Sequence, residues 1–456
     1  MKKRKVLVAN RGEIAVRIIK ACQDLDIETV LVASEADTES MAAKLADEVV
    51  CIGPPHVTLS YLDLAKIIDA ALQTGADAIH PGYGFLAENP ELPAACEKND
   101  IVFIGPRSET MQQLGDKISA RSLAEKNDIP MTDGSKGLRS FKDVEAEVQK
   151  IGSLPVVFKA AAGGGGRGMR IVTEQGNLKD AFDIASNEAL QVFGDATLFV
   201  ERYVQNARHV EVQVIGDNFG NLIHLGQRDC SAQRRYQKII EEAPPPNLPD
   251  DLRNKMLDAA VELTSSVGYN NAGTVEFLVD KDRNEFYFME VNSRIQVEHP
   301  VTEEITGVDL VKEQIQVAFG APLSLNQEDI DFQGHAIECR ITAEDARDSF
   351  MPSPGDITYF ALPGGKNVRI DTHCHQGCTI SPYYDPLLAK LITTGNTRAD
   401  ALANMETALA EFKIEGIETN ISFLQFLVKQ LEFAAGDIQV NWIEHTILPN
   451  FVELLK

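Results

Sequence analysis

The chain has 456 residues, of which 44% are hydrophobic and 24% are charged, so its composition is that of folded globular proteins and excludes disordered, collagen-like and coiled-coil chains. Lys and Arg number 43 and Asp and Glu number 68, which gives a formal net charge of −25 and disfavours binding to nucleic acid or anionic lipid. No apolar run approaches the ~20 residues that span a bilayer, and seven scattered cysteines are typical of a reducing compartment. We therefore expect a cytoplasmic protein that binds neither nucleic acid nor membrane.

The first segment alternates short apolar strands with helices. A strand is expected at 5–9, followed by a turn at Asn10–Gly12 and a helix at 13–22 with apolar residues at helical spacing. The alternation continues with strands at 28–33, 76–79 and 101–104 and a helix at 62–72. This order predicts a doubly wound α/β domain with a parallel sheet, whose strand ends are available for ligands. We place this domain at residues 1–114.

The middle segment is expected to be α+β. Its predicted strands lie at 155–160, 170–173, 198–200, 209–215, 221–226, 273–279 and 285–291. Its last helix ends near Gly320, which suits the position after a helix, and Pro322 prevents continuation. The acidic, proline-rich stretch 241–249 is expected to be an ordered loop. We place this domain at residues 115–325.

A third domain is expected at residues 334–446, with several strands followed by helices. Thr397 and Asp400 form a capping box, and the apolar residues that follow share one helical face. The sequence shows no internal repeat.

A glycine-rich loop at 163–168 lies between two predicted strands. Glycine lets backbone amides approach an anion closely, so we interpret this loop as a phosphate lid. The loop is neither a Walker A motif nor a dinucleotide fingerprint. The alternatives are a hairpin tip without function and, for the neighbouring Lys159, an ordinary surface lysine instead of a phosphate ligand.

Two carboxylates are expected to face each other across a hairpin formed by 274–279 and 285–290. Any register that pairs even with even positions places Glu276 and Glu290 on one face, about 5 Å apart when directly opposite. Oxygen ligands favour Mg²⁺ beside a nucleotide, and Asn292 has the parity to add one. Two solvated surface acids are the alternative, which the apolar neighbours disfavour.

Arg294, Gln296 and Glu298 alternate in sequence and would project together from an extended segment. Arginine can grip a small oxyanion, and a neighbouring glutamate can act as a base. A surface ion pair explains the same pattern equally well. The basic cluster at 233–238 suits a phosphate pocket better than a duplex. The His and Cys residues of 371–378 are too close in sequence to complete a tetrahedral site, so we expect no zinc.

Together these motifs resemble the biotin carboxylase component of biotin-dependent carboxylases, a branch of the ATP-grasp superfamily, over essentially the whole chain. The resemblance rests on the following segments: Ala9–Ala15, His80–Leu86, Gly115–Lys117, Gly163–Met169, Arg228–Ser231, Gln233–Arg235, Arg294–Pro300 and Glu338–Arg340. It implies an N-terminal biotin carboxylase domain, an ATP-grasp domain with a mobile glycine-rich lid at about 131–203, and a mixed α+β C-terminal domain.

The resemblance also implies the reaction. Biotin on a separate carrier protein would be carboxylated by bicarbonate, with ATP and Mg²⁺ or Mn²⁺, through carboxyphosphate, giving ADP, phosphate and N-carboxybiotin. The implied partners are the biotin carboxyl carrier protein, a second copy of the chain in a homodimer, and a carboxyltransferase subunit. We find no lysine between two methionines that would carry biotin, and the chain ends at Lys456. The carboxyl acceptor is left open among acetyl-CoA, propionyl-CoA, pyruvate and 2-oxoglutarate.

The resemblance assigns roles to matching residues. The ATP-binding residues would be Lys117, Lys159, Gly164, Gly165, Gly166, Glu201, Tyr203, Val204, His209, Gln233, Tyr236, Lys238 and Glu276. The metal ligands would be Glu276, Glu290 and Asn292. The residues for bicarbonate and biotin would be Tyr83, Arg294, Gln296, Val297, Glu298 and Arg340. Among them Glu298 would be the base, Lys238 would steady carboxyphosphate, and Arg340 would stabilise charge on the biotin ureido oxygen.

The chain departs from the family pattern at two places. Ala161 and Ala162 precede a shortened glycine run, and Tyr236 stands where histidine is common; both changes bear on nucleotide binding. Two other functions compete with the family reaction. One is an ATP-grasp ligase that joins a carboxylate to an amine, and the other is a catalytically silent nucleotide-binding regulator.

Overall fold

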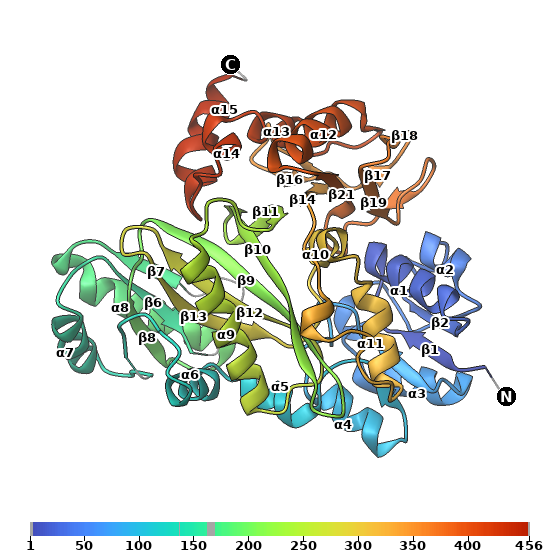
Figure 1. Cartoon of the computed structure of the whole chain (residues 1–456), viewed down its shortest axis with the longest axis horizontal. Helices are drawn as coiled ribbons and strands as arrows, with labels where there is room; N and C mark the ends of the chain where they lie inside the picture. Colours follow the sequence, from blue (N-terminus) through green and yellow to red (C-terminus); the bar gives the residue numbers. More distant parts are fainter. Residues whose placement is uncertain (1–2, 136, 162–168, 455–456) are drawn as a thin grey trace.

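The N-terminal segment forms a parallel sheet with the strand order β3-β2-β1-β4-β5. The computed structural model describes residues 3–135, 137–161 and 169–454, and this sheet lies beside the rest of the chain (Figure 1). The elements are β1 (Lys5–Val8), α1 (Gly12–Asp24), β2 (Glu28–Ala33), α2 (Met41–Leu45), β3 (Glu48–Cys51), η1 (Val57–Leu59), α3 (Leu64–Thr74), β4 (Ala78–His80), α4 (Glu91–Lys98), β5 (Val102–Phe103) and α5 (Ser108–Gly115).

Alternate residues of this sheet face opposite layers of helices. Val6 and Val8 pack with α1, whereas Leu7 packs with α3 and α4, because side chains alternate along a strand. The doubly wound fold is thereby confirmed, and so are the four predicted strands. The prediction missed β3, an edge strand whose mostly exposed residues lack a buried pattern.

The next part forms a small antiparallel sheet with the order β7-β6-β8, against which α7 and α8 pack. The elements are α6 (Lys117–Lys126), α7 (Phe141–Ile151), β6 (Val156–Ala160), β7 (Met169–Val172), η2 (Gln175–Asn177), α8 (Leu178–Phe193) and β8 (Leu198–Arg202). The predicted strands at 155–160, 170–173 and 198–200 are confirmed. Gly163–Gly168 lie outside the described residues.

A long sheet with the order β13-β12-β9-β10-β11-β14-β21-β19 joins the middle of the chain to its C-terminal part. Its middle part and the helices beside it are β9 (Ala207–Gly216), β10 (Leu222–Arg234), β11 (Gln237–Ala243), α9 (Asp250–Ser266), β12 (Asn271–Asp280), β13 (Glu285–Asn292), α10 (His299–Thr306), α11 (Leu310–Ala318) and η3 (Gln327–Asp329). The even residues of β9, such as Val210 and Val212, pack under α9. The odd residues, including His209 and Glu211, therefore point to the opposite face.

The prediction of a loop at 241–249 is wrong for its first three residues, which belong to β11 and pair with β14. Two acidic residues can be buried in this strand because cations meet them: Glu241 pairs with Arg340, and Glu242 with Arg398. Likewise β10 extends well past the predicted end at residue 226, to Arg234.

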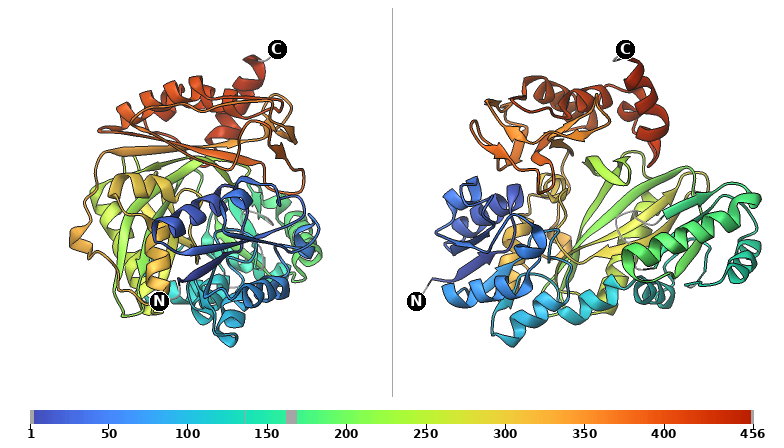
Figure 2. Two further views of the ribbon diagram at one scale, coloured as in Figure 1. Left: turned by 90° about the vertical axis from the view of Figure 1, so that its right-hand side faces the viewer. Right: turned by 180° about the vertical axis from the view of Figure 1, so that it is seen from behind.

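The C-terminal part places helices over the far end of the long sheet (Figure 2). Its elements are β14 (His335–Thr342), β15 (Glu344–Asp345), β16 (Met351–Pro352), β17 (Gly355–Asp356), β18 (Tyr359–Ala361), β19 (Val368–Thr372), β20 (Thr379–Ile380), β21 (Leu387–Gly395), α12 (Arg398–Glu411), β22 (Lys413–Glu415), α13 (Ile421–Leu427), α14 (Leu431–Ala434), η4 (Ile443–Ile447) and α15 (Leu448–Leu454). The capping box of Thr397 and Asp400 is confirmed, and the apolar face of α12 packs on Ile337, Cys339 and Leu391.

The parts of the chain share packed surfaces. Residues of α1 and α11 pack with Ile215 and Leu225 of the long sheet in one apolar cluster, so the N-terminal sheet is held against the site-bearing sheet. The domain boundaries at 114/115 and 325/334, and the lid at about 131–203, stay predictions. Within the described residues, no helix combines the length and the apolar character that crossing a membrane requires.

Candidate active site

Lys238 is the centre of a buried ionic cluster on the face of the long sheet opposite α9. Its Nζ donates hydrogen bonds to Glu211 Oε2 at 2.6 Å, Glu276 Oε1 at 2.9 Å and Glu298 Oε1 at 2.6 Å. The strand register explains why two of these carboxylates are adjacent, since Glu276 of β12 pairs directly with Glu211 of β9. Burial opposes the charge of Lys238, but these carboxylates raise its pKa well above the ordinary value. The ammonium is therefore a permanent cation.

Glu298 lies between two cations just before α10 and is fully buried. Its Oε1 accepts from Lys238, and its Oε2 accepts from Arg340 Nη2 at 2.8 Å. Burial opposes ionisation, but Lys238, Arg340 and then Arg228 lower the pKa of Glu298 well below its ordinary value. Glu298 is thus ionised at neutral pH, which is the form that a base requires, and the two cations beside it can also hold an anion.

Arg340 bridges a carboxylate of β11 and the one just before α10. Its Nε donates to Glu241 Oε1 at 2.6 Å, while its Nη2 reaches Glu298. Burial, opposed by Arg340, raises the pKa of Glu241 to about 7. A guanidinium held in this way is oriented before any ligand arrives.

Arg294 and Gln296 lie together, as their spacing predicts. Arg294 Nη1 donates to Gln296 Oε1 at 2.8 Å, and Gln296 Nε2 is buried with no partner in the described part of the chain. Glu298 does not join them through a hydrogen bond within the described residues; it turns to Lys238 and Arg340. The backbone carbonyl of Val297, between these groups, accepts from Lys390 Nζ at 2.9 Å. An unpaired buried N–H beside a guanidinium suits a small oxyanion.

The hairpin carboxylates take the predicted register. Glu276 pairs directly with Glu290, and Asn292 pairs with Thr274 on the same face. Burial and the charge of Glu276 raise the pKa of Glu290, as expected for two adjacent acids, and no ion pair of Glu290 occurs among the described residues. The two carboxylates and the Asn292 amide form an oxygen donor set that fits Mg²⁺ or Mn²⁺.

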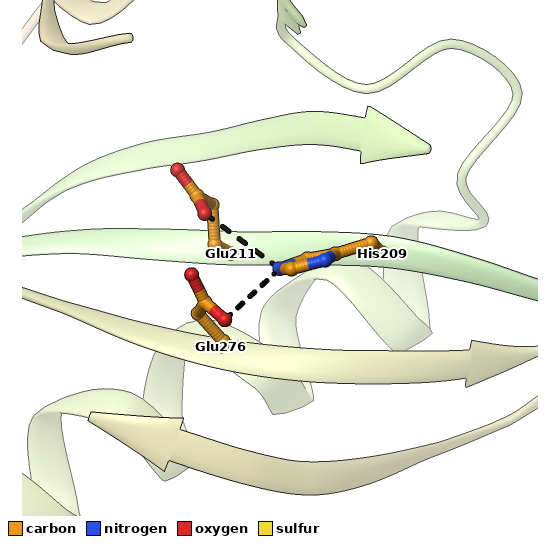
Figure 3. A group of neighbouring side chains, drawn as sticks. All are labelled: His209, Glu211 and Glu276. Carbon is orange, nitrogen blue, oxygen red and sulfur yellow. Dashed lines mark ion pairs between the residues drawn. The ribbon is translucent and has the colours of Figure 1, made fainter. Parts of the chain in front are cut away.

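His209, on β9, lies close to Glu276 and Glu211 (Figure 3). Its Nε2 lies 3.2 Å from Glu276 Oε2 and 3.8 Å from Glu211 Oε2. Burial lowers the pKa of His209, but the charge and hydrogen bond of Glu276 together with the charge of Glu211 outweigh it, so the net shift is upward. Its Nδ1 contacts Gln233 Nε2 at 2.8 Å, which orients the ring.

Two of the predicted nucleotide residues lie on the small sheet, Lys159 on β6 and Glu201 on β8. Glu201 accepts from Lys159 Nζ at 2.7 Å and from Arg121 Nη1 at 2.9 Å. Burial opposes its ionisation, but Lys159 and Arg121 lower the pKa of Glu201 to about 2. Lys117 begins α6, and burial lowers its pKa, an effect that Glu290 opposes.

The remaining predicted nucleotide residues lie just after β8 and in the turn between β10 and β11. Tyr203 and Val204 follow β8 directly. Tyr236 is exposed in the turn between β10 and β11 with φ of 64°. The predicted ligands Gly164, Gly165 and Gly166 lie outside the described residues.

Tyr83 reaches the cluster from the N-terminal sheet. Its hydroxyl donates to Glu13 Oε1. Burial and the charge of Glu13 raise the pKa of Tyr83, and the charge of Arg340 opposes that shift. The loop that carries Tyr83 is shaped by Asn10, whose Nδ2 donates to the carbonyls of Pro81 and Tyr83, each at 2.7 Å. All three parts of the chain thus contribute side chains to one site.

Sequence reasoning assigned no role to two buried residues of the cluster, Glu211 and Arg228, although Arg228 opens one of the segments that resemble the family. Glu211 accepts hydrogen bonds from two cations: its Oε2 from Lys238 Nζ, and its Oε1 from Arg228 Nε at 2.6 Å. Arg228 is fully buried and also donates to Gln213 and Thr302. The available signal was the alternation of His209, Glu211 and Gln213, three polar residues on one face of an otherwise apolar strand.

The described residues contain two sets of three His, Cys, Asp or Glu donor atoms within 4.8 Å of one another. They are His209, Glu211 and Glu276, and Glu211, Cys230 and Glu298. Both sets belong to the cluster around Lys238, and neither includes a residue of 371–378.

The chain matches three protein families in succession. These are "Biotin carboxylase, N-terminal domain" at residues 2–111, "Carbamoyl-phosphate synthase L chain, ATP binding domain" at 116–326, and "Biotin carboxylase C-terminal domain" at 338–445.

Known proteins resemble the chain over nearly its full length. Biotin carboxylase 1 of Bacillus subtilis is 49% identical, covering 97% of this chain and 98% of the relative. One subunit of the pyruvate carboxylase of Methanothermobacter thermautotrophicus is 47% identical over 96% of this chain and 89% of the relative.

Solved structures agree with these relatives. The Campylobacter jejuni biotin carboxylase complex with β,γ-ATP has a TM-score of 0.94 and 43% identity, covering 97% of this chain and 99% of that one. The biotin carboxylase domain dimer of Hydrogenobacter thermophilus 2-oxoglutarate carboxylase, solved with MgADP, ADP and bicarbonate, has a TM-score of 0.93 and 44% identity, covering 97% and 98%.

Proposed function

Because the chain belongs to the biotin carboxylase family, we propose that it carboxylates biotin on a separate carrier protein, using bicarbonate, ATP and Mg²⁺ or Mn²⁺. The family and the enzyme class predicted from the sequence, an ATP-dependent carboxylase, are confirmed. The observation that carries the residue assignments is the position of Glu298, a buried carboxylate held between Lys238 and Arg340.

The first step activates bicarbonate, which is a poor electrophile. Arg294, Gln296 and the Val297 backbone would bind it, and Glu298 would accept its proton so that an oxygen attacks the γ-phosphorus of ATP and ADP leaves. The unpaired Gln296 Nε2 and the Arg294 guanidinium supply donors for this anion. The product, carboxyphosphate, is more negatively charged, and Lys238 would hold it.

Glu276, Glu290 and Asn292 would hold the divalent cation. When bound with ATP, such a cation neutralises charge on the phosphate oxygens. Lys117, Lys159 and the glycine loop would bind the nucleotide phosphates. Glu201, Tyr203, Val204, His209, Gln233 and Tyr236 would complete the nucleotide site.

The second step transfers the carboxyl group to the ureido nitrogen of biotin. The bond between the carboxyl carbon and the phosphate oxygen breaks, and the departing phosphate would take up the proton that the nitrogen loses. Negative charge develops on the ureido oxygen, and Arg340 would stabilise it from its fixed position between Glu241 and Glu298. Tyr83, held by Glu13 at the edge of the same cluster, would contact biotin.

The partners follow from the reaction. We propose that a biotin carboxyl carrier protein presents biotin, that a separate carboxyltransferase subunit chooses the acceptor, and that the enzyme works as a cytoplasmic homodimer. The relative that is one subunit of a pyruvate carboxylase and the dimer of the 2-oxoglutarate carboxylase domain support this arrangement.

Incorporation of radiolabelled bicarbonate into free biotin tests the proposal. We expect an acid-labile, ATP-dependent product that requires Mg²⁺ and the intact Glu298. Hydrolysis of ATP without a labelled biotin product, or transfer of a carboxylate to an amine instead, would exclude this function.

A further inference from the structure

Lys390 is a fully buried cation of the C-terminal part with no role in the chemistry described above. It lies in β21, directly paired with Arg340 of β14, and its side chain has no exposed surface. Its Nζ donates to the Val297 carbonyl at 2.9 Å and lies 3.2 Å from Glu13 Oε2. Burying an ammonium is unfavourable unless partners satisfy it, so these contacts fix where the side chain lies.

The two partners of Lys390 belong to the proposed binding sites of two different substrates. Val297 belongs to the segment that would bind bicarbonate. Glu13 is a buried residue of α1, and its other oxygen, Oε1, accepts a hydrogen bond from the hydroxyl of Tyr83. Tyr83 would contact biotin. Two further acids lie near Lys390. Asp371 lies 3.9 Å away and is already held by Arg369 at 2.9 Å, and burial raises the pKa of Glu338, a shift that the charge of Lys390 opposes.

The contacts of Glu13 show that Lys390 is its cation. Burial raises the pKa of Glu13, and Lys390 opposes that shift. Without Lys390 the Glu13 carboxylate would be buried beside no other ion-paired cation in the described part of the chain, and the Val297 carbonyl would lose its donor. Unpaired buried groups of this kind force local rearrangement, and here the rearrangement would move both Val297 and Tyr83.

We propose that Lys390 is a positioning residue that holds both the Val297 peptide and the Glu13–Tyr83 pair in place. Lys390 would therefore affect the affinity for bicarbonate and the affinity for biotin at the same time. This inference rests on the proposed function, because it assigns the two subsites to those substrates. The residue joins three parts of the chain: it lies on β21, contacts the segment before α10 and holds α1 of the N-terminal sheet.

The test compares Lys390→Met with Arg398→Met in the full-length chain. Arg398 is a second largely buried cation of the C-terminal part, paired with Glu242 at 2.6 Å and in contact with neither Val297 nor Glu13. We expect Lys390→Met to raise the KM for bicarbonate and for free biotin by about tenfold or more, while the KM for ATP changes less than about twofold. Arg398→Met should lower thermal stability without this split among the KM values.

A double-mutant cycle with Glu13→Gln separates positioning from a general loss of stability. Glu13→Gln removes the charge that Lys390 pairs with but leaves its contact with Val297, so it should raise the KM for biotin more than that for bicarbonate. If the path to Tyr83 runs through Lys390, the double variant should have the biotin KM of Lys390→Met alone. If instead the rise in biotin KM of the double variant equals the product of the rises in the two single variants, the proposal is wrong.

The outcomes distinguish this inference from the proposed function. If the wild-type chain shows no biotin-stimulated, bicarbonate-dependent ATP hydrolysis, the proposed function fails and this inference fails with it. If the wild type is active and folded Lys390→Met keeps both KM values, the inference alone is wrong. If Lys390→Met does not fold, Glu13→Gln decides: an unchanged biotin KM overturns the proposal, and a selective rise supports it.

Discussion

Lys238 Nζ lies 2.6 Å from Glu298 Oε1, so the base and the cation that would hold the intermediate neutralise each other before substrates bind. Glu298 is a weak base in this state, because Lys238 and Arg340 lower its pKa. An anion that binds either cation weakens that contact and raises the basicity of Glu298. Binding of the anion would thus make Glu298 a stronger base only when the substrate is present.

Glu298→Gln keeps the shape of the side chain but removes the base. We expect bicarbonate-dependent ATP hydrolysis to fall by at least about a hundredfold, the usual contribution of a general base. Nucleotide affinity should change much less, because Lys238 is the one predicted ATP-binding residue to which Glu298 is hydrogen-bonded in the described part of the chain. Steady-state hydrolysis and fluorescent nucleotide titration measure the two quantities, and unchanged turnover would contradict the role of Glu298.

Arg340→Gln should separate the two steps of the reaction. The guanidinium is assigned to the ureido oxygen, so biotin carboxylation should fall by about a hundredfold or more. The slow hydrolysis of ATP that needs bicarbonate but not biotin should stay within about tenfold of wild type. Arg340→Lys, which keeps the charge but not the bidentate geometry, serves as the control. Equal loss of both activities in Arg340→Gln would contradict the assignment.

The double variant Glu276→Gln/Glu290→Gln tests the metal site. Removing two carboxylates should raise the Mg²⁺ concentration for half-maximal activity by about tenfold or more, because a hard cation prefers charged oxygen ligands. Glu285→Gln, an exposed acid at the start of the same strand β13, is the matched control and should leave the Mg²⁺ requirement unchanged. An unchanged requirement in the double variant would exclude the hairpin as the metal site.

His80 predicts a pH dependence of stability. This residue is fully buried, its Nδ1 accepts from the Gly82 amide at 3.0 Å, and burial lowers its pKa from 6.5 to about 3. Folded chains keep His80 neutral while unfolded chains take up a proton below about pH 6.5, so its contribution is full above that pH and is lost as the pH falls towards about 3. Between pH 7 and pH 5 the loss is about 2 kcal/mol.

His80→Asn keeps an acceptor for Gly82 but cannot be protonated. The melting temperature of this variant should depend less on pH between 7 and 5 than that of the wild type, even if it is lower at pH 7. An identical pH dependence in both proteins would show that His80 does not titrate in this way.

The sequence predicted the elements whose side-chain periodicity has one simple cause. Side chains alternate along a strand, so any register that pairs even with even residues places Glu276 and Glu290 on one face. The structure pairs them directly. The capping box at Thr397 depends on four consecutive residues and was likewise predictable. In contrast, the acidic, proline-rich composition of 241–249 predicts a loop, whereas Glu241 lies in β11. Its burial depends on Arg340, about a hundred residues later.

Residues that act through distant partners were invisible to local reasoning. Tyr83 could be assigned only through the family resemblance, since its hydrogen bond to Glu13, and the ion pair of Glu13 with Lys390, depend on how distant parts of the chain pack. Lys390 lies in an apolar strand with no neighbouring motif, and only the structure places it between Val297 and Glu13. Pattern reasoning finds side chains that share an element, and packing decides which elements meet.

ATP hydrolysis by the purified chain, with Mg²⁺ and bicarbonate and with or without free biotin, tests the central claim most directly. The account predicts slow hydrolysis that depends on bicarbonate, and strong stimulation when biotin is added, because carboxyphosphate then transfers its carboxyl group to an acceptor. Hydrolysis that ignores both bicarbonate and biotin, or no hydrolysis at all, would contradict it.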